Sequence, residues 1–159
     1  MEKPIDNHIA RCCSTAGIPI IGRRVEVDCE IQGIRTPCLW DTGSQLSLVS
    51  IDWLKSTLQD YTIQPVMDLI SHPLTIEGVG NKPVPYAGVA PLEFKLGLES
   101  SGEAVLVPFL VCEVEMRKPI IGTNVIEYLM GGDTLECKLE KISAFGLKSS
   151  ETKAVTAQV

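Results

Sequence analysis

The amino-acid sequence predicts an all-β domain built from many short strands. Three features support this prediction: short stretches in which apolar and polar residues alternate, frequent turn residues (13 Gly and 10 Pro in 159 residues), and only two segments with helical spacing of apolar side chains. Together they are typical of a closed barrel or a sandwich. A chain of this length has room for one such domain with a core of useful size.

The first expected strand covers residues 24–31, where Val25, Val27, Cys29 and Ile31 occupy every second position, and Gly33 marks the turn after it. The further expected strands, in chain order, are 34–40, 46–50, 69–77, 84–98, 104–113 and 135–144. Most of these segments are short and separated by turn residues, as in an all-β barrel or sandwich.

Two short helices are expected among these strands. Ile51, Leu54 and Leu58 share one face at helical spacing, and a second helix over 124–130 should end at Gly131-Gly132. Both ends of the chain differ from its middle, since residues 1–17 are weakly patterned and residues 146–159 are polar. We therefore place the domain at 18–145, between an N-terminal segment and a C-terminal linker.

Composition and charge argue against several classes of partner. A net charge of −6 does not suit a nucleic-acid-binding surface. The apolar stretch 105–112 is too short to cross a bilayer, and residues 1–4 do not resemble a signal peptide. We expect a soluble cytoplasmic protein that contacts no membrane.

The cysteines and histidines do not suggest a metal site. Without a secretory signal, most of the six cysteines should be free thiols, and Cys29, Cys38 and Cys112 lie in strand-like segments where cysteine acts as a small apolar residue. His8 and His72 belong to no cysteine and histidine set with zinc spacing. We expect neither a metal nor a cofactor.

The most informative segment is Asp41-Thr42-Gly43-Ser44. Turns of the form Asp-x-Gly are common, so the four residues alone indicate little. Apolar residues, however, both precede this turn (37–40) and follow it (Leu46, Leu48 and Val49). The carboxylate of Asp41 is therefore expected at the edge of a core, which is a typical position for a functional acid.

Three motifs resemble those of the retroviral-type aspartic proteases, or retropepsins. Residues 38–44 fit the family's apolar run followed by Asp-Thr-Gly-Ser. The run Ile120-Ile121-Gly122, with Asn124 two positions later, fits the motif that opens the family's C-terminal helix, and Ile76-Glu77-Gly78-Val79-Gly80-Asn81 fits its flap hairpin. The motifs occur in the family's order within 18–145. The residues around Asp41 are most similar to the protease of a long-terminal-repeat retrotransposon polyprotein.

The resemblance implies a closed retropepsin-like β-barrel with one short C-terminal helix, active as a C2 homodimer with flap hairpins. The chemistry needs two carboxylates that share one proton around a water molecule. Asp133-Thr134 lacks the following glycine, and a two-lobed single-chain enzyme needs about twice this length. A second copy of the chain should therefore supply the second Asp41.

In such a dimer, one ionised Asp41 acts as general base on the water, and its protonated partner donates to the scissile carbonyl oxygen. By resemblance, Thr42 hydrogen-bonds across the dimer beneath the dyad, Gly43 permits a close backbone approach, and Ser44 donates to an outer carboxylate oxygen. The substrate-pocket walls implied by position are Leu39, Val79 and Ile121. A plain hairpin turn explains the flap motif equally well.

The expected activity is that of an aspartic endopeptidase that cleaves extended, mainly apolar junctions in its own Gag-Pol-type polyprotein. The expected location is the cytoplasm, including virus-like particles. Two alternatives remain at this stage. One is a catalytically silent retropepsin-like dimerisation or peptide-binding domain, and the other is a retropepsin-like domain of a ubiquitin-pathway shuttle protein that cleaves only special clients.

Overall fold

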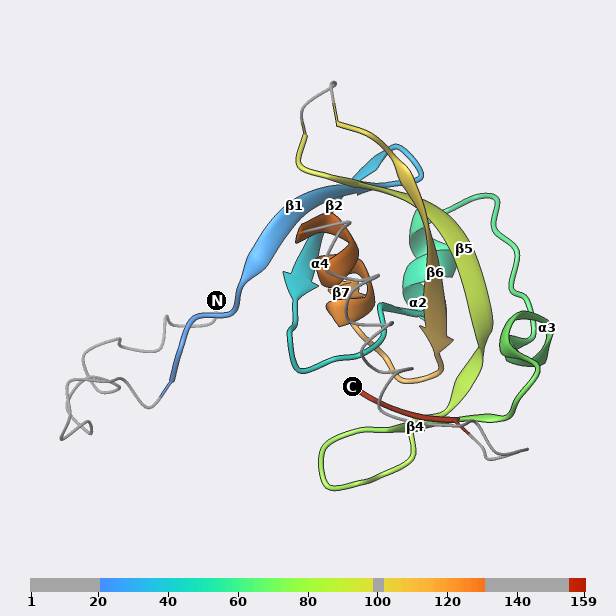
Figure 1. Ribbon diagram of the computed structural model, residues 1–159. Coiled ribbons are helices and arrows are strands. Elements are labelled where there is room, and N and C mark those ends of the chain that lie inside the picture. The colour runs from blue at the N-terminus through green and yellow to red at the C-terminus, as the bar shows by residue number, and fades with distance from the viewer. Residues whose placement is uncertain (1–20, 99–101, 131–154) are drawn as a thin grey trace, which may run out of the picture.

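Strands dominate the computed structural model of the chain, which describes residues 21–98, 102–130 and 155–159 (Figure 1). The elements in chain order are β1 (Glu26–Ile31), β2 (Ile34–Trp40), β3 (Leu48–Ser50), α2 (Ile51–Thr57), α3 (Val66–Ile70), β4 (Leu74–Glu77), β5 (Tyr86–Leu96), β6 (Val105–Cys112), β7 (Ile120–Ile121), α4 (Thr123–Met130) and β8 (Val155–Gln158). Six strands close into a barrel in the order β1-β2-β7-β3-β6-β5. The predicted closed all-β barrel with one short C-terminal helix, α4, is confirmed.

The barrel is built from two antiparallel hairpins and two short inserted strands. β1 pairs with β2 along its whole length, and Gln32 and Gly33, with φ of 51° and 74°, form the tight turn between them. β5 and β6 form the longer hairpin, and β1 pairs with β5. The short strands β3 and β7 fill the space between β2 and β6, with β2–β7 and β3–β6 both parallel.

Two clusters of apolar side chains make up the core. The first fills the barrel, and its largest members are Phe94 and Phe109, whose ring centroids lie 6.4 Å apart. The second lies where β3, β5 and β6 meet the β4 hairpin, and its buried members are Leu48, Val66, Ile76, Val89, Leu110 and Cys112. The second cluster thus ties the hairpin that carries the flap motif to the barrel.

The three cysteines of the described segments are buried free thiols, as expected. Burial raises the pKa of the Cys112 thiol to about 11. These side chains therefore act as small apolar core residues. Within the same segments, no helix is long and apolar enough to cross a membrane.

Helix α2 occupies the segment with helical spacing, and the Ser50 hydroxyl caps it by accepting a hydrogen bond from the Trp53 N–H. Helix α3 was not predicted, because residues 69–77 were expected to form one strand. Pro65 starts this helix and Ser71 ends it in a left-handed conformation, so that β4 begins only at Leu74. The apolar Leu69 and Ile70 are exposed, and they do not belong to a strand face.

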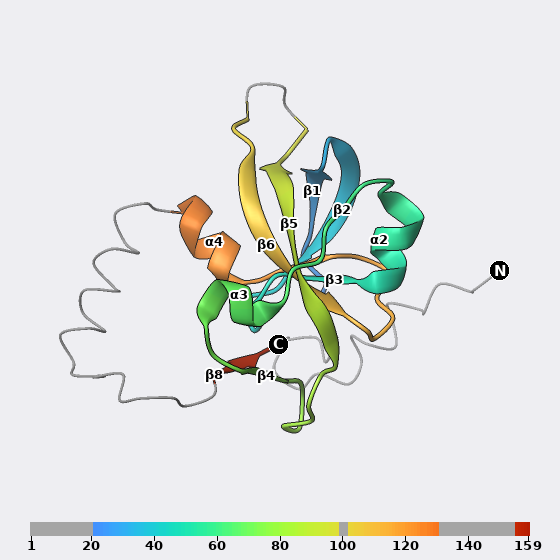
Figure 2. The ribbon, with the colours of Figure 1, turned by 90° about the vertical axis from the view of Figure 1, so that its right-hand side faces the viewer.

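The prediction that 146–159 is a linker is wrong for its last residues. Val155–Gln158 forms strand β8, which pairs in parallel with β4 outside the barrel, and Figures 1 and 2 both show the two strands side by side. The polar composition of the segment gave no sign of a strand. Its pairing partner lies about 80 residues earlier in the chain, so no local pattern could indicate the pairing either. The expected segment 1–17 and the expected strand 135–144 lie outside the described residues.

Candidate active site

Asp41 directly follows β2, in a turn whose main chain fixes the position of the carboxylate. Its N–H donates to the carbonyl oxygen of Ile121 at 2.9 Å, and its Oδ1 accepts the N–H of Gly43 at 2.8 Å. Asp41 is half-buried, whereas Thr42 and Gly43 are exposed. A carboxylate thus lies at the edge of the barrel core, held by backbone hydrogen bonds and still open to solvent on one side.

Ser44 does not have the role that the sequence suggested. Its side chain is buried, and its hydroxyl donates to the carbonyl oxygen of Leu46 at 2.7 Å. The prediction that Ser44 donates to an outer oxygen of Asp41 is therefore wrong. Ser44 instead stabilises the chain as it leaves the turn.

The motif around Gly122 lies directly behind this turn. β7 pairs with β2, with Leu39 opposite Ile120 and Trp40 opposite Ile121. A Cβ atom on Gly122 would collide with the carbonyl oxygen of Leu46 and would lie 2.8 Å from that of Ser44. Only glycine permits this approach of two backbone segments.

A buried hydrogen-bond network joins the two segments. The Ser47 hydroxyl accepts the N–H of Gly122 at 3.1 Å and donates to Oδ1 of Asn124 at 2.8 Å. The carbonyl oxygen of Ser44 accepts the N–H of Thr123 at 2.8 Å. Asn124 is thus placed where the motif predicts it. Sequence reasoning missed Ser47, and the only signal for it is a serine within an apolar run.

The predicted flap motif forms the tip of a hairpin. The Val84 N–H donates to the carbonyl oxygen of Ile76 and the Gly78 N–H to that of Lys82, both at 2.8 Å. Gly80 and Asn81 turn the chain with φ of 77° and 57°. Val79 at the tip is 94% exposed, whereas Ile76 at the base is buried in the second core cluster.

The three predicted pocket residues do not come together in the single chain. Ile121 is completely buried in the barrel core, so the prediction that it lines a pocket is wrong. Leu39 is half-buried in β2, and Val79 is at the exposed hairpin tip. The two residues of β7 face opposite ways: Ile121 lies in the first core cluster, and Ile120 packs against the second. The sequence motif alone does not show which of the two faces inward.

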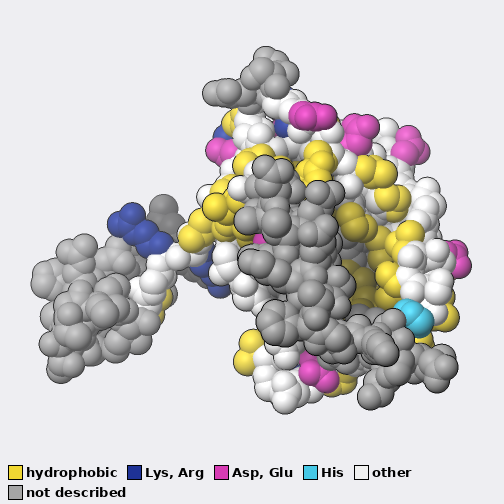
Figure 3. Space-filling view, in the orientation of Figure 1, with side chains coloured by type: hydrophobic (Ala, Val, Ile, Leu, Met, Phe, Trp, Pro, Cys, Tyr) yellow, Lys and Arg dark blue, Asp and Glu magenta, His cyan; other side chains and the backbone are white. Residues whose placement is uncertain are grey.

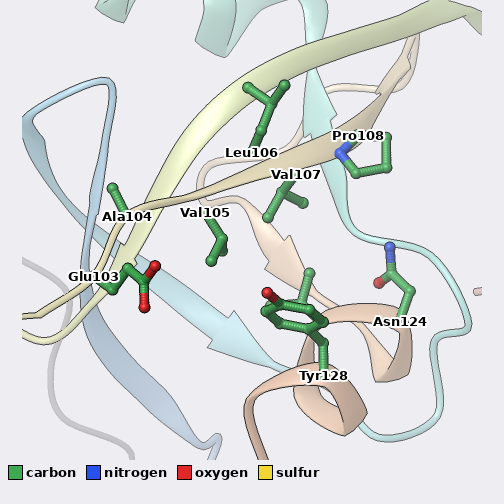
Figure 4. Close-up of a pocket in the computed structure, with 9 residues that line it drawn as sticks. Glu103, Ala104, Val105, Leu106, Val107, Pro108, Asn124 and Tyr128 are labelled. Atoms are coloured by element: carbon green, nitrogen blue, oxygen red, sulfur yellow. The ribbon is translucent and has the colours of Figure 1, made fainter. Parts of the chain in front are cut away.

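A hollow of about 490 Å³ lies between β6 and α4 (Figure 4). Val105 and Val107 line it from the strand, and Asn124 and Tyr128 line it from the helix. Apart from this hollow, Figure 3 shows apolar side chains at the surface in the orientation of Figure 1. Asp41 does not line the hollow, so we do not assign the chemistry to it. No group of three or more His, Cys, Asp or Glu in the described segments is arranged to hold a metal ion.

Solved structures that are similar to the chain include two proteases and one retroviral protease-like domain. The EIAV protease in complex with the inhibitor HBY-793 aligns with a TM-score of 0.49 at 17% identity, over 72% of this chain and 95% of that one. The retroviral protease-like domain of Ddi1 from Leishmania major aligns at 0.45 and 15% identity, over 68% and 78%. The protease of simian foamy virus (mac) aligns at 0.41 and 19% identity, over 67% and 96%. No family model and no curated protein matches the sequence.

We predict that Gly122→Ala strongly destabilises the fold, because the added methyl group meets backbone oxygens that cannot move aside. The expected loss in free energy of unfolding is at least about 2 kcal/mol, as for other overpacked sites. Urea denaturation followed by circular dichroism measures it. Gly22→Ala is the control, since no atom lies within 4 Å of its added methyl group. Equal stability of the two variants would contradict this view of the contact.

Ser47→Ala should cost about 1–3 kcal/mol, because the buried N–H of Gly122 and the amide oxygen of Asn124 each lose a partner. The matched control is Ser56→Ala, which removes an exposed hydroxyl bonded only to the carbonyl oxygen of Trp53. Thermal unfolding of both variants tests this. If Ser47→Ala and Ser56→Ala unfold at the same temperature, the network does not stabilise the fold.

Proposed function

We propose that the chain is an aspartic endopeptidase whose active site forms between two copies. The observation that carries this proposal is the Asp41 carboxylate, held by the Gly43 N–H in a solvent-open turn at the barrel edge. Such a site orients a carboxylate and leaves it accessible from solvent, and general acid–base chemistry requires a positioned, accessible group. The Asp-Thr-Gly-Ser, flap and Ile-Ile-Gly motifs, which resemble those of retropepsins, support the same activity.

The second copy follows from the stoichiometry of the reaction. Peptide hydrolysis by this mechanism needs two carboxylates that share one proton. Within the described residues, Asp41 alone belongs to an Asp-Thr-Gly turn. Two-fold symmetry would place the exposed Thr42 and Gly43 of two turns against each other and pair the two Asp41 side chains.

In that dimer, the ionised carboxylate removes a proton from the attacking water, while the protonated one donates to the scissile carbonyl oxygen. The water oxygen bonds to the carbonyl carbon and gives a gem-diol. The carboxyl that took the proton from water passes it to the leaving nitrogen, and a gem-diol hydroxyl returns its proton to the other carboxylate. Breakage of the C–N bond then releases an amine and a carboxylic acid, and the pair again holds one proton. No covalent enzyme intermediate forms. The proposed natural substrate is the polyprotein that contains the chain, cleaved at extended apolar junctions.

A second candidate function is peptide binding without cleavage. Its specific support is strand β8, an extended segment held by main-chain hydrogen bonds close to Asp41. Binding of this kind needs only an exposed strand edge and no acid. The two functions differ in one respect, because Asp41 is essential to the first and dispensable to the second.

We expect Asp41→Asn to lower kcat/KM by at least about a hundredfold, the lower range for loss of a positioned acid or base. Asn keeps an oxygen that can accept the Gly43 N–H, so the fold should be retained. The assay is cleavage of a mixed peptide library, with and without pepstatin, followed by mass spectrometry. Asp60→Asn, at an exposed position, is the control. An Asp41→Asn variant as active as that control would exclude the aspartic mechanism.

Specific activity should rise with protein concentration, because one chain holds half of the site. Below the dimer dissociation constant, activity should fall with the square of the concentration. A peptidomimetic that spans both halves should raise the dimer fraction seen by sedimentation, since it binds only the dimer. An active species that sediments as a monomer, with activity linear down to nanomolar concentration, would refute the shared site.

A further inference from the structure

Residues 155–159 lie between the hairpin that carries the flap motif and the chain that follows Asp41. On one side, β8 pairs in parallel with β4, with Ile76 opposite Ala157 and Glu77 opposite Gln158. The Val159 N–H continues this ladder by donating to the carbonyl oxygen of Glu77 at 3.0 Å. The segment thus adds a strand to the edge of the hairpin, as extended peptides do when they bind a sheet edge.

On its other side, the same segment contacts Gln45, four residues after Asp41. The N–H of Gln45 donates to the carbonyl oxygen of Gln158 at 2.8 Å, and its side-chain Oε1 accepts the Gln158 N–H at 2.8 Å. Both main-chain groups of Gln158 are therefore satisfied by one residue of the active-site loop. Residues 155–159 bridge the hairpin and this loop.

Side chains along the segment alternate between the molecule and solvent. Ala157 is buried, Gln158 is exposed, and Val159 packs against the second core cluster. The half-buried residues that also pack against this cluster include Leu46, Val84 and Ile120. The side chains of Ala157 and Val159, two positions apart, therefore both face the molecule, as on one face of a strand.

From these contacts we infer that Gln45, Glu77 and the edge of β4 form a groove for extended peptides, and that residues 155–159 occupy it as an internal competitor. The ligand class is an extended peptide with small aliphatic side chains at the positions of Ala157 and Val159. Because the segment belongs to the same chain, it competes with a free peptide intramolecularly. Competition with a cleavable substrate rests on the proposed function, whereas occupation of the groove does not.

The test measures binding of a fluorescent peptide of residues 153–159, with every protein carrying Asp41→Asn so that no cleavage occurs. Ala157→Asp in the full chain puts a charge into the apolar groove and should release the internal segment. Fluorescence anisotropy should then show binding at least about tenfold tighter than to the otherwise unchanged chain. Gln59→Asp adds the same charge to an exposed side chain outside the segment, and it should leave the affinity unchanged.

A second variant covers the case in which Ala157→Asp disturbs folding. Deletion of residues 155–159 leaves all six barrel strands, and it should give the same gain in peptide affinity. Amide hydrogen exchange gives an independent measurement. The Gln45 N–H should lose protection at least about tenfold on deletion, while the Leu110 N–H, which donates to Ser47 in the barrel, should not change. Equal peptide affinity, or unchanged Gln45 exchange, would overturn the inference.

Kinetics separate this inference from the proposed function. If the chain cleaves peptides, deletion of residues 155–159 should lower KM several-fold with little change in kcat. The deletion removes a competitor for the groove and leaves the catalytic carboxylates in place. If no variant cleaves peptides but the affinity difference is found, the groove stands and the protease proposal fails. If the chain cleaves peptides but the deletion changes neither KM nor peptide affinity, the occupied groove is refuted and the protease proposal stands.

Discussion

The rest of the site depends on one constraint, the close approach of two backbone segments. At this point Gly122 lies against the carbonyl oxygens of Ser44 and Leu46. No side chain fits between these segments, and the Ser47 hydroxyl fastens them through the Gly122 N–H and the Asn124 side chain. Buried networks of this kind tolerate little displacement, since any shift leaves a polar group unpaired. The turn that carries Asp41 is thus anchored to a distant part of the chain.

This anchor also explains the strand order of the barrel. β2 leads into the Asp41 turn and β3 leaves it, and β7 lies between them, parallel to the first and antiparallel to the second. The Asp41 N–H can donate to Ile121 only because β7 occupies this place. A strand of two residues thereby closes the barrel and positions the carboxylate, which accounts for the apolar pair directly before Gly122.

Sequence patterns predicted those parts of the structure that depend on local chemistry. Strand 34–40, the Asp41 turn and the glycine-rich hairpin were found because alternation and turn residues act over a few positions. Side-chain direction at the site was not predictable in the same way. Ser44 turned to Leu46 and Ile121 to the core, and a pattern of residue types cannot distinguish the two faces of a short strand. Strand β8 was missed because its partner is remote in the chain.

The C-terminal strand gives the site a property that neither the turn nor the hairpin has alone. Without residues 155–159, β4 would present an edge of unpaired main-chain groups, and such an edge tends to recruit another strand. In this chain residues 155–159 satisfy it, and Gln45 adds two further hydrogen bonds from the loop that holds Asp41. Any substrate that uses the same edge must displace a tethered strand of similar length. In the groove that we propose, the affinity for a peptide would be set by the difference between two similar binding energies. Changes in residues 155–159 would then alter the choice of peptide without altering Asp41.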